Sequence, residues 1–399
     1  MNEAQIYLLS ILRRQMGVSD TMPFPKNEQL RRDIVEESIR QSVCLSLFDS
    51  LYESERDNGV AYRTLKKYAD ATYKNNIEGY EHHREASALL AKHGIDHAII
   101  KGIASDRFYK KRFIRAIGDV DVIIHPDTLE CAGKALVDEG FKLIENTGDH
   151  HRAYIKGACR IELHHTVGSL PVRLQGELDN IIFGKNGIIE SADTLRYGDT
   201  DIPVASAFFH GLTLLVHTAG HIQNEGIGLR HLYDWAAFMQ SCEDPEGSFG
   251  DTPHMLGLMH LARVLTKACE YIGLTPRTFS QGVPDDTAKA LIEDIFAVGN
   301  MGAKNTDDRF SSVNRNSEKK AEGMLPYLVK TLNNHVYTHI PAAKKHKLLL
   351  VPGYAYVLVR RLWLRLTGKR ARINIGKSYD SAIRRDRLIR SLELYEEKK

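Results

Sequence analysis

The sequence contains little cysteine, and its cysteines follow no ligand or disulfide pattern. The 399 residues include five cysteines, an odd number, and no two of them form a Cys-x-x-C pair. Zinc sites of the ribbon type need such pairs, and disulfide frameworks need an even number of closely spaced cysteines. The sequence indicates neither, and we expect reduced core thiols at Cys44, Cys131, Cys159, Cys242 and Cys269.

The N-terminal residues also do not have the pattern of a secretory signal peptide. The chain starts Met1-Asn2-Glu3-Ala4, with an amide and an acid where a signal peptide has basic residues followed by a long apolar core. Hydrophobic residues make up 43% of the chain and charged residues 26%, which is ordinary for a globular protein. We therefore expect a cytoplasmic protein, and the length suits two or three domains.

Helical and strand patterns divide the chain into three parts. Residues 1–92 have helical spacing, with a helix at 4–16 and two longer amphipathic stretches between 27 and 92. Residues 205–399 are helical again, apart from a Gly, Asn and Asp-rich stretch between Gly299 and Asn316. Between them, residues 93–204 alternate: we predict helices at 103–110 and 127–138, and strands at 97–101, 119–124, 141–145, 151–156, 159–165, 187–191 and 200–204. This pattern predicts an α+β protein with a mixed sheet core flanked by helical regions.

Two carboxylates stand inside one of the predicted strands. Asp119 and Asp121 belong to the run Gly118-Asp-Val-Asp-Val-Ile-Ile124, whose apolar residues are typical of a buried strand. Side chains alternate across a strand, so both acids point to the same face, about 6.6 Å apart along it. A buried strand excludes acids unless their charge is compensated, and a divalent cation can supply that compensation. The alternative is an Asp-x-Asp pair in a turn or a surface strand.

A glycine and two cations precede these acids. Lys101 and Gly102 end the strand at 97–101, and a glycine there lets backbone N–H groups approach an anion closely. The helix predicted after them would direct its N-terminus at the same anion. Arg115 stands four residues before Asp119 and could reach the same phosphates. The alternative is that Lys101 and Arg115 are ordinary solvated cations.

A third acid lies in a later strand. The segment Cys159-Arg-Ile-Glu-Leu-His-His165 alternates, which places Arg160, Glu162 and His164 on one face. Beside the Asp-x-Asp strand, Glu162 would complete a cluster of three carboxylates and could accept a proton from an attacking hydroxyl. His164 would lie at the edge of that cluster.

In this order the motifs resemble the nucleotidyltransferase (polymerase beta-like) superfamily. Lys101-Gly102, Arg115, Gly118-Asp119-Val-Asp121 and Glu162-Leu-His164 are most similar to its branch of uncharacterised nucleotidyltransferases. The likeness covers residues 85–240 well. It includes a helix before the first strand, at 88–95, and a later helical region with Leu214-Leu-Val-His217 and Leu229-Arg-His-Leu-Tyr-Asp234.

The resemblance implies a magnesium-dependent transfer of a nucleoside monophosphate from a nucleoside triphosphate such as ATP to an acceptor, with release of pyrophosphate. By position, it implies that Asp119, Asp121 and Glu162 hold two Mg²⁺ ions, with Mn²⁺ as an alternative metal. Residues addressing the triphosphate would be Lys101, Gly102, Arg115, Gly118 and His164. The chain departs from the superfamily in having Lys-Gly where Gly-Ser or Gly-Gly is usual, so the phosphate grip or the reaction can differ.

The later helical region adds four polar residues near the motif. His217 and His221 have the spacing of metal ligands on a helix, but the glutamate of a zinc-protease helix is missing between them. We favour helix packing or support of the site by hydrogen bonds for His217. Arg230 and Asp234 have the spacing of a helix-surface ion pair, and facing the cleft they could instead brace the nucleotide or the acceptor.

The C-terminal region concentrates positive charge. Residues 344–390 hold fourteen Lys and Arg against two Asp, a net charge of +12 in a chain whose total is +3. Inside this basic segment, residues 348–359 form an uncharged apolar run of twelve residues, too short to cross a bilayer. The pattern is typical of a helix that contacts a membrane surface or another polyanion such as RNA. The alternative is a core helix with a solvated basic face.

Three functional classes follow. The first is an active nucleotidyltransferase whose hydroxyl acceptor is a small molecule, a glycan precursor, or a peptide or protein. The second is a nucleotidyltransferase that acts on RNA, supported by the basic segment alone. The third is a catalytically silent protein that keeps the fold and binds nucleotides or polyanions.

Overall fold

The computed structural model describes residues 1–144, 150–168, 170–241, 244–300, 332–333, 336–337, 340–344, 346–366 and 375–396. The chain forms two compact units. The first consists of residues 1–222, 226–304 and 392–399, and the second of residues 223–225 and 305–391. All candidate site residues lie in the first unit, while the domain boundaries expected at residues 92 and 204 stay predictions.

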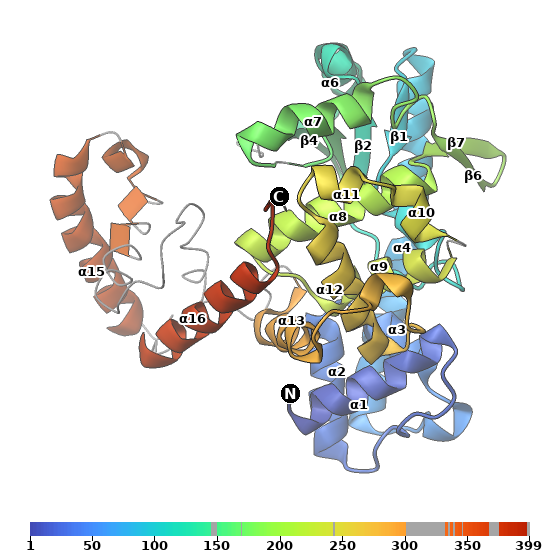
Figure 1. Ribbon diagram of the computed structural model, residues 1–399, viewed down its shortest axis with the longest axis vertical. Helices are drawn as coiled ribbons and strands as arrows, with labels where there is room; N and C mark the ends of the chain where they lie inside the picture. The colour runs from blue at the N-terminus through green and yellow to red at the C-terminus, as the bar shows by residue number, and fades with distance from the viewer. Residues whose placement is uncertain are drawn as a thin grey trace. The chain divides into compact units, whose positions relative to one another are not determined.

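Four helices form the N-terminal part of the first unit (Figure 1). They are α1 (Glu3–Leu12), α2 (Glu28–Arg40), α3 (Cys44–Ser50) and α4 (Val60–Lys92). Asn2 and Asn27 begin the first two helices, because each side chain accepts a hydrogen bond from a backbone N–H of the first turn. The buried stripe of α4 includes Tyr80 and Leu90, which pack on the sheet.

The core is a mixed sheet of seven strands in the order β3-β4-β5-β2-β1-β7-β6. The central strand β2 is antiparallel to β1 and parallel to β5, and β7 is parallel to β1. Hairpins at the two edges pair β3 with β4 and β6 with β7. The strands are β1 (His97–Ile99), β2 (Val120–Ile124), β3 (Lys142–Ile144), β4 (His151–Lys156), β5 (Cys159–His164), β6 (Asp193–Tyr197) and β7 (Thr200–Val204).

The two faces of this sheet differ in chemistry. Val122 and Leu163 point to one face, where they form a core with α4 and with α6 (Leu129–Asp138). Side chains alternate along a strand, so Asp121 and Glu162 point to the opposite face. One face therefore holds the core together, and the other carries the polar residues singled out above.

Helices continue after the sheet. They are α8 (Ala207–Asn224), α9 (Leu229–Ser241), α10 (Pro245–Phe249), α11 (Thr252–Met255), α12 (Met259–Cys269) and α13 (Asp285–Val298). The second unit contains α15 (Leu350–Leu366) and α16 (Ile375–Ser391), with Val336, Ala343 and Val357 in a small apolar cluster. No helix in the described ranges combines the length and the apolar character that a membrane span requires.

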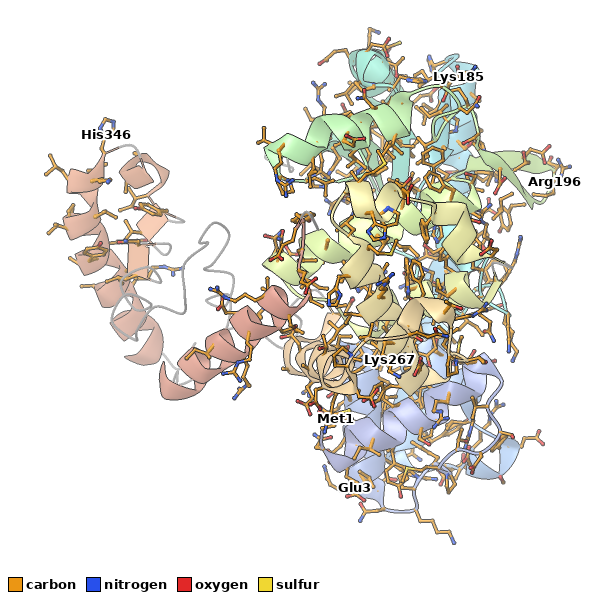
Figure 2. The ribbon with its side chains drawn as sticks, in the orientation of Figure 1. Met1, Glu3, Lys185, Arg196, Lys267 and His346 are labelled. Carbon is orange, nitrogen blue, oxygen red and sulfur yellow. The ribbon has the colours of Figure 1, made fainter. Side chains whose placement is uncertain are left out.

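Several element predictions were wrong. The helix predicted at 103–110 is the short α5 (Ile103–Asp106). No strand forms at 187–191, because Ser191 N–H bonds to Gly187 O in a turn, and the edge strand is β6 instead. Its hairpin turns at Gly198, which has a φ of 60°, and Arg196 (labelled in Figure 2) pairs with Asp201 across it at 2.8 Å.

The structure also adds features that the sequence pattern did not reveal. A helix, α7 (Val172–Phe183), follows β5, where no element was predicted. Cys131 is exposed rather than packed in the core, whereas Cys44, Cys159 and Cys269 are buried, and all four are free thiols. Cys242 lies outside the described residues, and so does the Gly, Asn and Asp-rich stretch between Gly299 and Asn316 from residue 301 on.

Candidate active site

The register of two parallel strands places Asp121 beside Glu162. In the pairing of β2 with β5, Val120 faces Ile161, Asp121 faces Glu162 and Val122 faces Leu163. Neighbouring strands lie about 4.8 Å apart and paired side chains share a face, so the two carboxylates lie together. Both residues are buried, at 7% and 9% exposure. Two adjacent buried acids need a compensating positive charge.

His164 completes a group of three metal-type ligands. Its Nε2 lies 3.0 Å from Asp121 Oδ1 and 3.5 Å from Glu162 Oε2. One ligand atom from each of Asp121, Glu162 and His164 lies within 4.8 Å of the other two. Two carboxylates and an imidazole fit a divalent cation that keeps further positions for water or phosphate oxygens. We call these three residues the carboxylate group.

Lys101 supplies a positive charge at the same place. Its Nζ lies 2.5 Å from Asp121 Oδ1, and its side chain retains 24% exposure. Burial alone would raise the pKa of Asp121, but the Lys101 ammonium and the His164 hydrogen bond outweigh it and hold that pKa well below the ordinary value. Asp121 is therefore ionised at neutral pH and available to a cation.

Asp119 lies outside the carboxylate group. Its side chain is 42% exposed, and its Oδ2 lies 3.5 Å from Arg160 Nε. The same guanidinium donates to Glu162 Oε1 at 2.7 Å, so Arg160 links Asp119 to Glu162. Burial and repulsion from Glu162 and Asp121 raise the pKa of Asp119, which Arg160 offsets in part. The structure thus brings together two of the three predicted carboxylates and holds the third near them through a cation.

Arg115 faces Asp234 rather than the acids of the sheet. Its Nε and Nη2 donate to the two oxygens of Asp234 at 2.7 and 2.9 Å, and both residues are buried. Burial lowers the pKa of Arg115, but the charge of Asp234 outweighs it and the net shift is upward. The alternative of a solvated Arg115 is wrong, and the expected contact of Arg115 with phosphate stays a prediction. Asp234 is likewise buried, not exposed in a surface pair with Arg230.

Two buried polar side chains fix the segment that leads to Asp119. Asn76 of α4 donates to Phe113 O at 2.6 Å and accepts from Ile117 N at 2.8 Å. Asp106 accepts from Tyr80 Oη at 2.6 Å and from Phe113 N at 3.0 Å. Sequence reasoning missed both, because a lone Asn or Asp carries no sign of a partner so far along the chain.

Only glycine fits well at position 102, because of its backbone conformation and because the His83 side chain lies close to it. Its φ is 58°, which L side chains rarely adopt, and a Cβ there would lie 2.3 Å from His83 Nε2. His83 donates from Nδ1 to Gly79 O at 2.7 Å, and burial lowers its pKa to about 4, so the ring is neutral. Gly102 thereby begins α5 directly after Lys101. Gly118 differs, because a Cβ there would meet no atom within 4 Å.

Residues from α8 and α9 lie near the polar face of the sheet. The rings of His217 and His164 are 6.1 Å apart, and His221 follows His217 at 6.3 Å. Burial and then the Lys101 charge lower the pKa of His217 well below its ordinary value, so it is neutral. Arg230 is half-buried and donates from Nη1 to Ala116 O at 3.3 Å. These helices therefore bring imidazole and guanidinium groups close to the predicted site.

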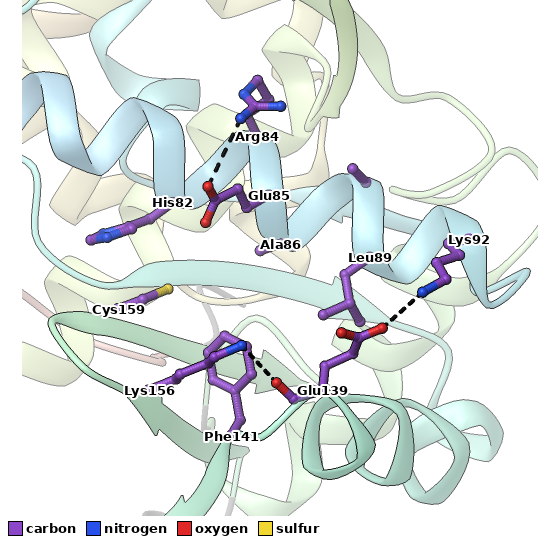
Figure 3. A pocket seen from close by; sticks show the side chains of 11 residues that line it. His82, Arg84, Glu85, Ala86, Leu89, Lys92, Glu139, Phe141, Lys156 and Cys159 are labelled. Carbon is purple, nitrogen blue, oxygen red and sulfur yellow. Dashed lines mark hydrogen bonds and ion pairs between the residues drawn. The ribbon is translucent and has the colours of Figure 1, made fainter.

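A pocket of about 480 Å³ lies elsewhere in the first unit (Figure 3). It is lined by residues of α4, including Leu89, and by Phe141, Lys156 and Cys159. Cys159 shares its strand face with Leu163, so the pocket opens on the side away from Asp121. Lys92 pairs with Glu139 at 2.8 Å along its rim. None of the predicted site residues lines this pocket.

The mixed sheet pairs two carboxylates with a histidine on one face, with a lysine beside them, and this donor set could hold a metal ion. The family model described as uncharacterised nucleotidyltransferase matches residues 28–274, more than half of the chain. The chain therefore belongs to this family and carries a nucleotidyltransferase-family domain. Comparisons with curated proteins and with solved structures give no match.

Proposed function

We propose that this protein is a metal-dependent nucleotidyltransferase that moves a nucleoside monophosphate from a nucleoside triphosphate to a hydroxyl acceptor. The observation that carries the proposal is the pairing of Asp121 with Glu162 across β2 and β5, with His164 and Lys101 both against Asp121. Buried carboxylates in register are costly unless a cation joins them, and Mg²⁺ or Mn²⁺ suits this donor set.

The residues divide the chemistry between them. Asp121 and Glu162 would hold the cation, with His164 beside them, and the bound metal would neutralise charge on the phosphate oxygens. Lys101 is close enough to exchange its contact with Asp121 for a phosphate oxygen. The acceptor hydroxyl forms the new bond to the α-phosphorus, the bond to the β-phosphate oxygen breaks, and pyrophosphate leaves. A carboxylate such as Glu162 accepts the hydroxyl proton.

The test combines two readouts on the full chain. Pyrophosphate release is measured with each of the four triphosphates, Mg²⁺ or Mn²⁺, and a metabolite pool, and the intact mass of the protein is followed in parallel. Pyrophosphate release that needs the pool identifies a small acceptor, whereas a mass increase of one nucleoside monophosphate identifies a protein hydroxyl. Failure of every triphosphate to turn over under both metals would contradict the proposal.

One observation favours a second candidate, a catalytically silent nucleotide-binding protein. Asp119 lies outside the carboxylate group and contacts Arg160, so two carboxylates rather than three converge with His164. Lys101-Gly102, which stands where the superfamily usually has Gly-Ser or Gly-Gly, also favours this candidate. Tight triphosphate binding with metal, without any pyrophosphate release, would favour this candidate over the first.

Replacing Lys101 by methionine is expected to separate metal binding from phosphate transfer. The change removes the cation that contacts Asp121, so the affinity for Mg²⁺ alone stays equal or rises, while turnover falls about 10²-fold or more because one phosphate contact is lost. Calorimetric titration with Mg²⁺ and the pyrophosphate assay measure the two effects.

A matched control for that variant is Lys111→Met, because Lys111 pairs with Asp49 and its side chain is 65% exposed. It should leave both quantities unchanged. Unaltered turnover in Lys101→Met would remove this residue from the phosphate site.

We further propose that the basic segment 344–390 contacts an anionic membrane surface. Its helix α15 buries Gly353 and Val357 on one side but exposes apolar residues on the other. Val351 is 72% exposed, Tyr356 50% and Val359 66%, next to the exposed Arg360. An exposed apolar face beside basic residues fits a lipid interface better than RNA, which would need cations and stacking groups instead.

The prediction is salt-sensitive binding to vesicles. The protein should sediment with phosphatidylserine-containing vesicles at low salt and be released as salt rises, and Val351→Asp with Val359→Asp should weaken binding about tenfold or more. Vesicles without anionic lipid are the control. Binding to RNA but not to vesicles, or to neither at low salt, would overturn this proposal.

A further inference from the structure

Three histidines gather at one end of the hairpin formed by β4 and β5. His151 begins β4 and pairs in register with His164, the last residue of β5, and His150 immediately precedes them. The ring centroids of His150 and His151 lie 4.5 Å apart, those of His151 and His164 5.0 Å, and those of His150 and His164 5.8 Å. We call these residues the imidazole group. The adjacent His150 and His151 are visible in the sequence, but their convergence with His164 depends on the strand register.

The nitrogens of this group converge as ligands do. One ring nitrogen from each histidine lies within 4.8 Å of the other two. Nitrogens bound about 2.1 Å from a tetrahedral Zn²⁺ are roughly 3.4 Å apart, so small side-chain rotations would bring the three into place. His164 is fully buried, and its Nδ1 has no hydrogen-bond partner in the described part of the chain. An orphaned buried nitrogen is costly, and a bound metal would satisfy it.

The surroundings leave two of the three rings little contact with water. The side chain of His151 is 12% exposed and that of His164 1%. A neutral imidazole nitrogen is the commonest metal ligand among side chains.

We propose that the imidazole group is a second cation site, distinct in chemistry from the carboxylate group, which takes a transition-metal ion such as Zn²⁺. Imidazole ligands suit Zn²⁺, Cu²⁺ or Ni²⁺, whereas Mg²⁺ and Mn²⁺ prefer oxygen. His164 belongs to both the imidazole group and the carboxylate group. A cation bound at one group would therefore affect the binding of a cation at the other through this side chain. The proposal uses no nucleotide chemistry and stands or falls independently of the proposed transfer reaction.

The experiment titrates the metal-free full chain with Zn²⁺ against a competing chelator, and with Co²⁺ under visible spectroscopy. One equivalent of Zn²⁺ should bind without nucleotide, and Co²⁺ should show the absorption of a nitrogen-ligated ion. In the double variant His150→Ala with His151→Ala, the affinity for Zn²⁺ should fall by more than about 100-fold. Replacing a residue that only supports a metal ligand costs about 10- to 100-fold, so a larger loss indicates that the two histidines bind the metal themselves.

The matched control removes the same number of imidazoles elsewhere. His93 and His346 are exposed, and His346 is labelled in Figure 2, so His93→Ala with His346→Ala should bind Zn²⁺ like the natural chain. A polar double variant, His150→Asn with His151→Gln, should lose zinc as the alanine variant does while its metal-free unfolding temperature matches the natural chain. Equal Zn²⁺ affinity in the natural chain and in both double variants at residues 150 and 151 would overturn the proposal. A loss of Zn²⁺ affinity in the control variant His93→Ala with His346→Ala would also overturn it.

Discussion

Asp121→Asn is expected to lower metal-dependent triphosphate turnover by roughly 10²- to 10³-fold or more. Asp121 is the carboxylate that Glu162, His164 and Lys101 all surround, and its low pKa keeps it ionised. The asparagine has almost the same shape but carries no charge, so the proposed cation would lose a charged ligand. Pyrophosphate release and calorimetric titration with Mg²⁺ should both report the loss.

Two further variants make this result specific to the site. Asp119→Asn is expected to stop metal-dependent turnover, because the family resemblance places Asp119 at the metal and Arg160 links it to Glu162. The fold should stay unchanged, because that side chain is 42% exposed and contacts only Arg160 among the described ion pairs. Asp127→Asn removes an exposed carboxylate just after β2 and should change nothing. If the Asp119 and Asp121 variants turned over at the natural rate, both assignments would have to be discarded.

Local sequence patterns were sufficient to predict the strands that carry the site. The alternation in residues 119–124 and 159–165 correctly predicted β2 and β5 and the shared face of Glu162 and His164, but Asp119, predicted inside the strand, precedes β2. Periodicity does not encode strand order, however, because pairing is decided by how the whole sheet packs against α4 and α6. That Asp121 faces Glu162, rather than a residue two positions away, became known only from the register.

Long-range pairing explains what sequence reasoning missed. Arg115 and Asp234 are 119 positions apart, and each has a nearer candidate partner along the chain. The local patterns therefore predict that Arg115 binds phosphate and that Asp234 pairs with Arg230. Their burial follows from the packing of α9 against the segment before β2, which no local pattern records. His150 was missed for the same reason. Two adjacent histidines do not by themselves indicate a metal site, and the third, His164, comes close to them only in the folded chain.

Asp234→Asn is expected to destabilise the protein by about 3–5 kcal/mol, the usual cost of leaving one member of a buried ion pair without its partner. Arg115 would keep its charge, and only the Ala116 carbonyl and the weaker influence of Asp106 would remain to offset it. Urea unfolding at pH 7 measures the change. The double variant Arg115→Met with Asp234→Leu should recover most of it, because both charges are then gone.

The pH dependence of this difference tests whether the ion pair is its cause. Burial raises the pKa of Asp234, but Arg115 outweighs it and the net shift is downward. A carboxyl whose folded pKa is lowered contributes fully above its unfolded pKa, about 3.9, and loses that contribution as pH falls through the folded value. The stability difference between the natural chain and Asp234→Asn should thus be constant from pH 5 to 8 and shrink below about pH 4. A small, pH-independent difference, joined by a large loss of turnover in Arg115→Met, would instead return Arg115 to the phosphate site.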